Sequence, residues 1–203
     1  MSECQRCGEC CKQGGPALHR EDLDLVESGP VGLAHLLTLR AGEPAFDQVA
    51  GAVAPLAGEI VKLAPAPGGA WTCRFYVGEA GCSIYRNRPL ECRLLDCRDP
   101  SALAAAYDRD RLVRADLLEP DSALAELVRA HQETCPVERA LELGRRARTG
   151  ESAARRELEA MCGADQAFRQ GLTARAPEAE AWLGFLFGRE LERVVRRAMN
   201  ASF

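Results

Sequence analysis

Apolar residues recur at helical spacing through the second half of the chain. After residue 99 they return every three or four positions between charged residues, as in helices that bury one face. The last segment is the clearest case, because Leu183, Phe187, Leu191 and Val194 form an apolar stripe opposite a row of arginines. Prolines, glycines and capping residues mark where each helix would start or stop. We expect helices over residues 102–107, 120–134, 137–148, 151–161 and 177–199.

The first half of the chain has shorter patterns. Apolar residues at 23–26 predict a short helix that ends near Gly29, and the run 31–39 predicts a second short helix before Gly42. Residues 59–63 alternate imperfectly between apolar and polar, which indicates a strand.

A β-hairpin is expected further along. Residues 71–77 are dense in aromatic and β-branched side chains and form the strongest strand pattern in the chain. A glycine-bounded turn follows, and residues 82–85 would return as the second strand. Pro89 then suits the first turn of a helix that ends near Leu95.

These patterns predict an α+β fold that is predominantly α. At 203 residues the chain is long enough for one domain, or for one domain with an extension. The expected organisation is a small cysteine-cluster metal-binding domain with a short β-hairpin over residues 1–98. A helical extension over residues 99–203 would follow it.

The first eleven residues contain four cysteines in the pattern C-x2-C-x2-C-C, namely Cys4, Cys7, Cys10 and Cys11. The residues between them are polar or charged, so the segment has no apolar face on which the thiols could be buried as core. In C-x2-C the intervening turn can direct both sulfurs at one metal, as in zinc and iron–sulfur sites. Adjacent side chains usually diverge, so Cys10 and Cys11 either serve two different metals or one of them has another role.

A second group of four cysteines lies at Cys73, Cys82, Cys92 and Cys97. Four nearby arginines would favour thiolate, the form that binds metal; they are Arg74, Arg86, Arg88 and Arg93. The sequence does not show which four of the eight thiols share a metal.

Two further cysteines stand alone in the helical half. Cys135 and Cys162 are expected to be buried as small apolar residues. His131 and Cys135 are four residues apart on one predicted helix, which makes them a minor metal candidate.

The charge balance and the start of the chain limit the class of protein. The net charge is -4 and neither half is strongly basic, so we expect no nucleic-acid partner. The apolar runs are too short for a membrane span. The chain does not open with the basic residues and apolar run of a secretory signal, so we expect none. We therefore expect a cytoplasmic protein, in which clustered thiols bind metal more often than they form disulfides.

The cysteine motif has a characteristic order. It consists of CQRCGECC at 4–11, CRF at 73–75, GCSIY at 81–85, RP at 88–89, CR at 92–93 and Cys97. In this order it resembles the YkgJ-type cysteine-cluster family, described as zinc- or iron-chelating domains, over about residues 1–98. The resemblance implies a metal bound by those eight cysteines, but it implies no settled reaction. A larger relative, the flagellin lysine N-methylase, shares the cysteine pattern.

Thiolate ligands fit zinc or an iron–sulfur cluster and exclude hard, oxygen-binding ions. The sequence leaves both metals open, with a slight preference for the cluster. The favoured function is a cysteine-ligated metal-binding protein whose helical half packs on the metal domain or binds a protein partner. A metal-dependent enzyme for redox or methyl-transfer chemistry is the alternative, although no catalytic residue can be assigned. A carrier or sensor with labile metal is a third possibility.

Overall fold

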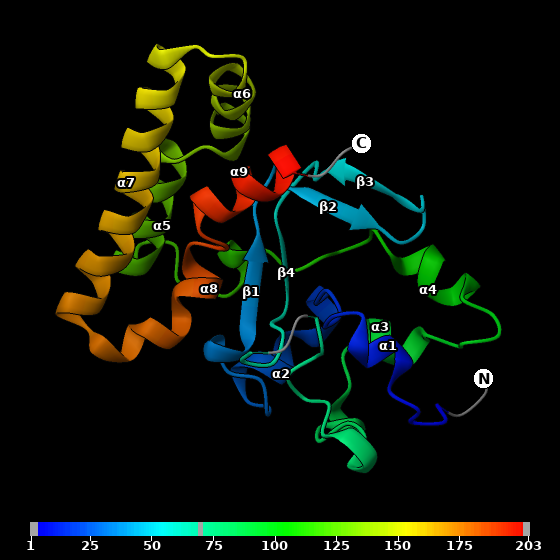
Figure 1. Cartoon of the computed structure of the whole chain (residues 1–203). Coiled ribbons are helices and arrows are strands. Elements are labelled where there is room, and N and C mark those ends of the chain that lie inside the picture. Colours follow the sequence, from blue (N-terminus) through cyan, green and yellow to red (C-terminus); the bar gives the residue numbers. More distant parts are fainter. Residues whose placement is uncertain (1–3, 69–70, 201–203) are drawn as a thin grey trace. The chain divides into compact units, whose positions relative to one another are not determined.

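The computed structural model describes residues 4–68 and 71–200, and the chain divides into two compact units (Figure 1). Unit 1 comprises Met1–Leu37 and Ile60–Leu117. Unit 2 comprises Thr38–Glu59 and Leu118–Phe203, so it is assembled from two separate parts of the chain. The expected division into residues 1–98 and 99–203 stays a prediction, since compactness alone does not test which part folds independently.

Unit 1 is built from short elements. Its α-helices are α1 (Glu9–Lys12), α2 (Leu23–Glu27), α3 (Leu90–Leu94) and α4 (Ser101–Ala106). Single turns of 3-10 helix connect them, namely η1 (Arg20–Asp22), η2 (Leu33–His35), η3 (Gly78–Ala80), η4 (Tyr85–Asn87) and η5 (Arg114–Asp116). The longest helix in the described part of this unit, α4, has only 6 residues. Helices this short are not stable without tertiary support.

The core of unit 1 forms around one strand, β4 (Ile60–Leu63). The amide of Leu18 donates to the carbonyl of Val61 at 2.9 Å, and the amide of Val61 donates to the carbonyl of Leu112 at 3.0 Å. The amide of Leu112 in turn donates to the carbonyl of Leu18 at 2.8 Å, and all three side chains are fully buried. β4 also pairs with β1 (Leu36–Leu39), which begins in this unit. Three distant segments therefore meet at β4.

Unit 2 contains the long helices. They are α5 (Ala123–Thr134), α6 (Val137–Arg148), α7 (Ser152–Arg175), α8 (Leu183–Leu186) and α9 (Leu191–Asn200), with the 3-10 helix η6 (Pro177–Trp182) before α8. α6 packs along α7 and also against α9 (Figure 1). The apolar core here includes Cys135, Ala140, Leu191 and Val194. The antiparallel hairpin of β2 (Pro44–Asp47) and β3 (Ala52–Pro55) belongs to the same unit, with Phe46 opposite Val53.

The predicted fold class is confirmed: the protein is α+β and predominantly α, with a small hairpin. Several elements also match their predictions, because the helices 23–27, 90–94, 101–106, 123–134 and 137–148 lie where the pattern placed them. The strand at β4 is confirmed as well. Among residues 4–68 and 71–200, no helix combines the length and apolar character that crossing a membrane requires.

The hairpin, however, is not where the sequence placed it. Residues 71–77 and 82–85 form no strands; of the expected pairing between them the isolated bridge Tyr76–Cys82 remains, while Cys73 forms a bridge to Pro65 instead. The reason is that only part of the backbone bonds across the loop. The amides of Val77 and Ser83 donate to the carbonyls of Gly81 and Phe75, but the amide of Cys73 donates to the carbonyl of Cys11 and the amide of Tyr76 donates back to the carbonyl of Cys73. β-propensity is weak when such specific bonds compete with it.

Three helix predictions are wrong in extent. Residues 36–39 form strand β1, since a short apolar run fits a strand as well as a helix and β4 offers a partner. α7 continues past Gly163, because a single glycine within a helix costs only about 1 kcal/mol and does not by itself end the helix. The expected helix 177–199 is instead broken after α8, because Gly188 has a positive φ of 69°.

Candidate metal centre

Helix α1 carries the adjacent cysteines Cys10 and Cys11. Gly8 caps its start in a left-handed conformation with φ 81°, and a Cβ atom there would lie 2.3 Å from the ring of Tyr76. Only glycine fits this position, so the helix begins tightly against the loop that contains Tyr76. The two thiols point to the same side, since their Sγ atoms are 4.0 Å apart. The side chains therefore converge, contrary to the usual divergence of neighbours.

The C-x2-C turn before α1 is shaped for thiolate chemistry. The backbone amide of Arg6 donates to Sγ of Cys4 at 3.4 Å, and Arg6 itself has a positive φ of 56°. An N–H group directed at sulfur stabilises negative charge on it, as in metal-bound thiolates. Cys4 and Cys7 are both exposed. The turn therefore presents two sulfurs to solvent and already supplies one of them with a hydrogen-bond donor.

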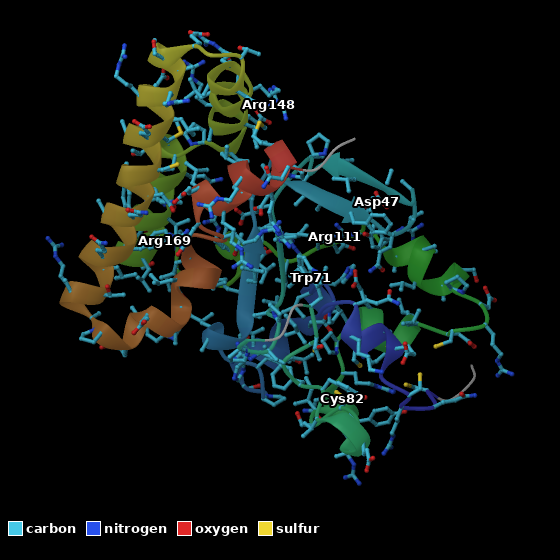
Figure 2. The ribbon with its side chains drawn as sticks, viewed as in Figure 1. Asp47, Trp71, Cys82, Arg111, Arg148 and Arg169 are labelled. Carbon is cyan, nitrogen blue, oxygen red and sulfur yellow. The ribbon has the colours of Figure 1, made fainter. Side chains whose placement is uncertain are left out.

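Cys73 and Cys82 belong to one loop, on which Figure 2 labels Cys82, and a backbone hydrogen bond joins this loop to α1. The amide of Cys73 donates to the carbonyl of Cys11 at 2.7 Å, and Tyr76 bridges to Cys82 across the loop. Cys73 is buried and Cys82 is half-buried. The backbone thus holds three cysteines from two distant segments on one hydrogen-bonded frame.

Cys92 lies in the middle of α3, whose start is anchored by two carboxylates. The amide of Leu90 donates to Oδ1 of the buried Asp22 at 2.8 Å, and the amide of Ala17 donates to Oε2 of Glu91 at 2.9 Å. α3 ends at Leu94, so Cys97 follows in irregular chain and is exposed. The end of the helix gives Cys97 a direction that an unbroken helix would not.

The thiols near α1 disfavour one another's ionisation. Burial raises the pKa of Cys11 to about 12, and the neighbouring thiols of Cys10, Cys73 and Cys82 add to the shift. Burial also raises the pKa of Cys73, with further increases from Cys82 and Cys10. Mutual repulsion of this kind requires the groups to be close together. Without a cation these thiols stay neutral at pH 7.

Cys92 and Cys10 complete this pattern. Burial raises the pKa of Cys92 well above its usual range, and the thiols of Cys73, Cys10, Cys11 and Cys82 raise it further. For Cys10, burial raises the pKa, hydrogen bonding with Cys11 lowers it, and the charges of Cys4 and Cys97 raise it again. A bound metal cation would reverse these shifts, because it stabilises thiolate directly.

The structure therefore brings most of the predicted ligands together. Five thiols gather around α1, the loop and α3, namely Cys10, Cys11, Cys73, Cys82 and Cys92. Cys4 and Cys97 connect to this group through Cys10, and Cys7 interacts with Lys12. Within residues 4–68 and 71–200, no three Cys, His, Asp or Glu side chains enclose a ready-made metal position. Ligation by all eight cysteines thus stays a prediction, although their chemistry and proximity fit zinc or iron.

The nearby arginines have other contacts. Arg74 donates to the carbonyl of Ala34 at 2.5 Å, and Arg93 pairs with Glu21 at 2.7 Å. Arg6 and Arg88 instead both stack on the ring of Tyr85, with guanidinium carbons 3.9 and 3.7 Å from the ring centroid. The sequence did not point to Lys62, whose positive charge partly opposes the raised pKa of Cys73.

The histidines and the lone cysteines have ordinary structural roles. His131 contacts Oδ1 of Asp165 through Nε2 at 2.7 Å, and Cys135 is fully buried in the core of unit 2. The minor candidate pair His131 and Cys135 therefore has its histidine bound to a carboxylate. Cys162 packs partly buried against the same core.

The comparisons with known proteins agree with this chemistry. The model of the family CxxCxxCC, described as "Putative zinc- or iron-chelating domain", matches residues 3–136. This match extends beyond the residues 1–98 that carry the motif, to the end of α5. No curated protein and no solved structure matches the chain.

Proposed function

Because the chain belongs to the CxxCxxCC family of zinc- or iron-chelating domains, we propose that unit 1 is a metal-binding module stabilised by its cysteine-ligated metal. The observation that carries the proposal is the gathering of five thiols from α1, the 73–82 loop and α3 in a unit whose helices are all short. Segments that lie about 80 residues apart in sequence have few other reasons to bring their thiols together.

Three contacts within the protein position the thiols or act on their charge. The backbone bond from Cys73 to Cys11 fixes the loop against α1. The amide of Arg6 donates a hydrogen bond to Sγ of Cys4, and the charge of Lys62 opposes the raised pKa of Cys73. A bound zinc or iron would supply folding free energy, and an iron–sulfur cluster would add electron transfer.

A structural role for the metal is better supported than a catalytic one. The gathered thiols raise one another's pKa, so a bound cation would offset a repulsion within the unit. The helices of unit 1 are too short to be stable alone and depend on tertiary contacts, to which a bound metal would add. We therefore place the metal as the element that links the segments of unit 1.

The deciding measurement is metal content per chain, with a visible spectrum, on protein purified without oxygen. A colourless protein with about two zinc ions would mean closed tetrathiolate sites. Brown protein with iron and acid-labile sulfide in near-equal amounts would mean a cluster. Protein that contains neither zinc nor iron in stoichiometric amount would overturn the proposal.

Two variants serve as a matched pair for this measurement. Cys73→Ser/Cys82→Ser removes two thiols of the gathered group and should lose metal. Cys135→Ala/Cys162→Ala removes the two thiols of unit 2 and should keep it. Equal metal loss in both variants would mean that binding does not depend on the site in unit 1.

A further inference from the structure

Arg40 is a charged side chain in the interior of unit 2, with an exposed fraction of only 2%. Its Nη1 atom donates to the carbonyl of Cys135, directly after α5, at 3.0 Å. Its Nε and Nη2 atoms are also buried, and among residues 4–68 and 71–200 they have no hydrogen-bond partner. Buried donors nearly always have a partner, so these two nitrogens call for an acceptor.

Asp165, one of the buried carboxylates of this unit, is engaged by other groups. Its Oδ1 atom contacts Nε2 of His131 at 2.7 Å and accepts from Nη2 of Arg169 at 3.1 Å. Its Oδ2 atom accepts from Nε of Arg169 and from the amide of Leu191, both at 3.1 Å. The guanidinium of Arg169 therefore already balances the charge of Asp165.

Glu43, the other buried carboxylate in the described part of unit 2, is engaged in the same way. Its Oε1 atom accepts from Nε of Arg189, and its Oε2 atom accepts from the backbone amide of Arg40 at 3.0 Å. Burial lowers the pKa of Arg40 even though the charges of Asp165 and Glu43 oppose this shift. The guanidinium of Arg40 is thus a third positive charge beside two carboxylates that already have partners, and a buried charge needs a counter-charge.

The two unpartnered nitrogens of Arg40 form one edge of its guanidinium. The N–H bonds of Nε and Nη2 are parallel, which is the geometry that binds both oxygens of a planar oxyanion. No side chain from position 188 covers Nε, because a Cβ atom on Gly188 would lie 3.6 Å from Nε but only 2.8 Å from the carbonyl oxygen of Thr38. A water molecule could accept from this edge, but it would leave the charge unbalanced.

We propose that the interior of unit 2 binds one small monovalent oxyanion on the Nε–Nη2 edge of Arg40. The ligand is a planar anion of the size of formate, nitrate or bicarbonate, since the edge is buried and offers two parallel donors. The bound anion would complete the hydrogen bonds of Arg40 and balance its charge. The site lies in unit 2, so it does not depend on the metal proposed for unit 1.

The test compares two anions at constant ionic strength, so that general screening of charge is the same in both. Urea unfolding of the full-length Trp71→Phe protein reports on unit 2, because Trp182 is then the only tryptophan. It is measured in mixtures of sodium formate and sodium gluconate, whose anion is too large for a buried site. A ligand that binds only the folded protein raises stability with its concentration, so the urea midpoint should rise as formate replaces gluconate. An unchanged midpoint, as a bound water molecule would give, would overturn the proposal.

Two variants of Arg40 separate its charge from its geometry. Arg40→Met removes both, whereas Arg40→Lys keeps the charge without the two parallel donors. Both should lose the rise in midpoint with formate. Arg156→Met is the matched control, since Arg156 is exposed on α7, and it should keep the rise. A response that persists in Arg40→Met would overturn the site, and a response that persists in Arg40→Lys would overturn the two-donor geometry.

A direct measurement decides if the Arg40 variants fail to fold. Equilibrium dialysis of the wild-type protein with radiolabelled formate should show about one formate bound per chain, displaced by nitrate but not by gluconate. Displacement by gluconate would place the anion on the surface and overturn a buried site. Formate that binds in no fixed ratio to the chain would overturn the proposal as a whole.

Discussion

The two units bury different chemistry. Unit 2 buries charged groups that the protein itself pairs: Asp165 accepts from Arg169 and from the amide of Leu191, and it contacts His131. Glu43 in the same unit is fully buried and pairs with Arg189. Unit 1 pairs its buried Asp22 in the same way, but it also holds buried and half-buried thiols that raise one another's pKa. A polar core can thus be completed from within or by an external cation.

The two units also differ in the length of their helices. α5 and α6 have 12 residues each and α7 has 24, and their apolar faces close around Cys135, Leu191 and Val194. Unit 1 has no comparable helix in the described part of the chain, since its longest has 6 residues. Long amphipathic helices bury enough surface to be stable together. We therefore expect unit 2 to keep its fold without metal and unit 1 to lose it.

Metal removal has the largest expected effect. Stripping the metal should unfold unit 1, because structural zinc supplies on the order of 10 kcal/mol or more in small domains. Hydrogen exchange with mass spectrometry should show lost protection at the amide of Cys73, while the amides of α6 stay protected. Unchanged protection in unit 1 after stripping would contradict the structural role of the metal.

The converse change is Asp165→Asn in unit 2. Asp165 is 1% exposed and its pKa is far below the usual range because, against the effect of burial, hydrogen bonds from His131 and Arg169 hold it charged. Removing one member of a buried charge pair costs about 3–5 kcal/mol. Urea unfolding in a Trp71→Phe background, where Trp182 is the only tryptophan, measures this in unit 2.

Glu142→Gln is the matched control for that experiment. Glu142 pairs with Arg139 and Arg146 on the exposed face of α6. Exposed pairs contribute little because water screens them, so the unfolding midpoint should stay within experimental error. A control that destabilised the protein as much as Asp165→Asn would remove the argument from burial.

Gly8→Ala should have an intermediate effect, confined to unit 1. The positive φ alone costs about 1–2 kcal/mol for alanine, and the added Cβ atom would also displace Tyr76. Gly78→Ala has the same kind of φ, 54°, but its Cβ atom would meet open space. Metal retained during dialysis should fall more for Gly8→Ala than for Gly78→Ala, and equal retention would contradict the packing argument.

The smallest effect expected is a pH dependence of unit 2. Burial lowers the pKa of His131, opposed by its bond to Asp165 and reinforced by the charges of Arg40 and Arg169. The unfolded chain therefore takes up the proton first, so stability is full above about pH 6.5 and falls as the pH decreases. His131→Asn should reduce the change in the urea midpoint of unit 2 between pH 7 and pH 5. The control His35→Asn, in unit 1, should leave that change as it is. An unchanged slope would exclude His131 as its source.

The sequence predicted the parts of the fold that local pattern determines. The helices 123–134 and 137–148 follow from periodicity with a capping Ser122, whose hydroxyl oxygen accepts from the amide of Ala125. The structure of residues 71–77 could not be predicted from their strand-like composition, because the amide of Cys73 bonds to the carbonyl of Cys11, 62 positions away. Long-range hydrogen bonds of this kind leave no periodic trace in the sequence.

The candidate site, too, could be predicted only in part from the sequence. Spacing identified the eight cysteines, but it could not show that α1 packs on Tyr76 or that Cys10 and Cys11 converge. The glycine after Cys7 was a signal, since a C-x2-C-G turn with its glycine in the left-handed region fits a tight approach of the backbone. Which cysteines are exposed depends on the tertiary fold.

The interleaved path of the chain affects how the protein is made. Synthesis crosses between the units after Leu37, Glu59 and Leu117. The hairpin of β2 and β3 leaves the ribosome long before α5 to α9 of its own unit exist, and roughly 10 s separate them at ordinary translation rates. By the end of that interval all the cysteines of unit 1 have been synthesised and can take up metal. The nascent chain would therefore complete its metal-binding half first, while the exposed Phe46 and Val53 of the hairpin wait for the rest of unit 2.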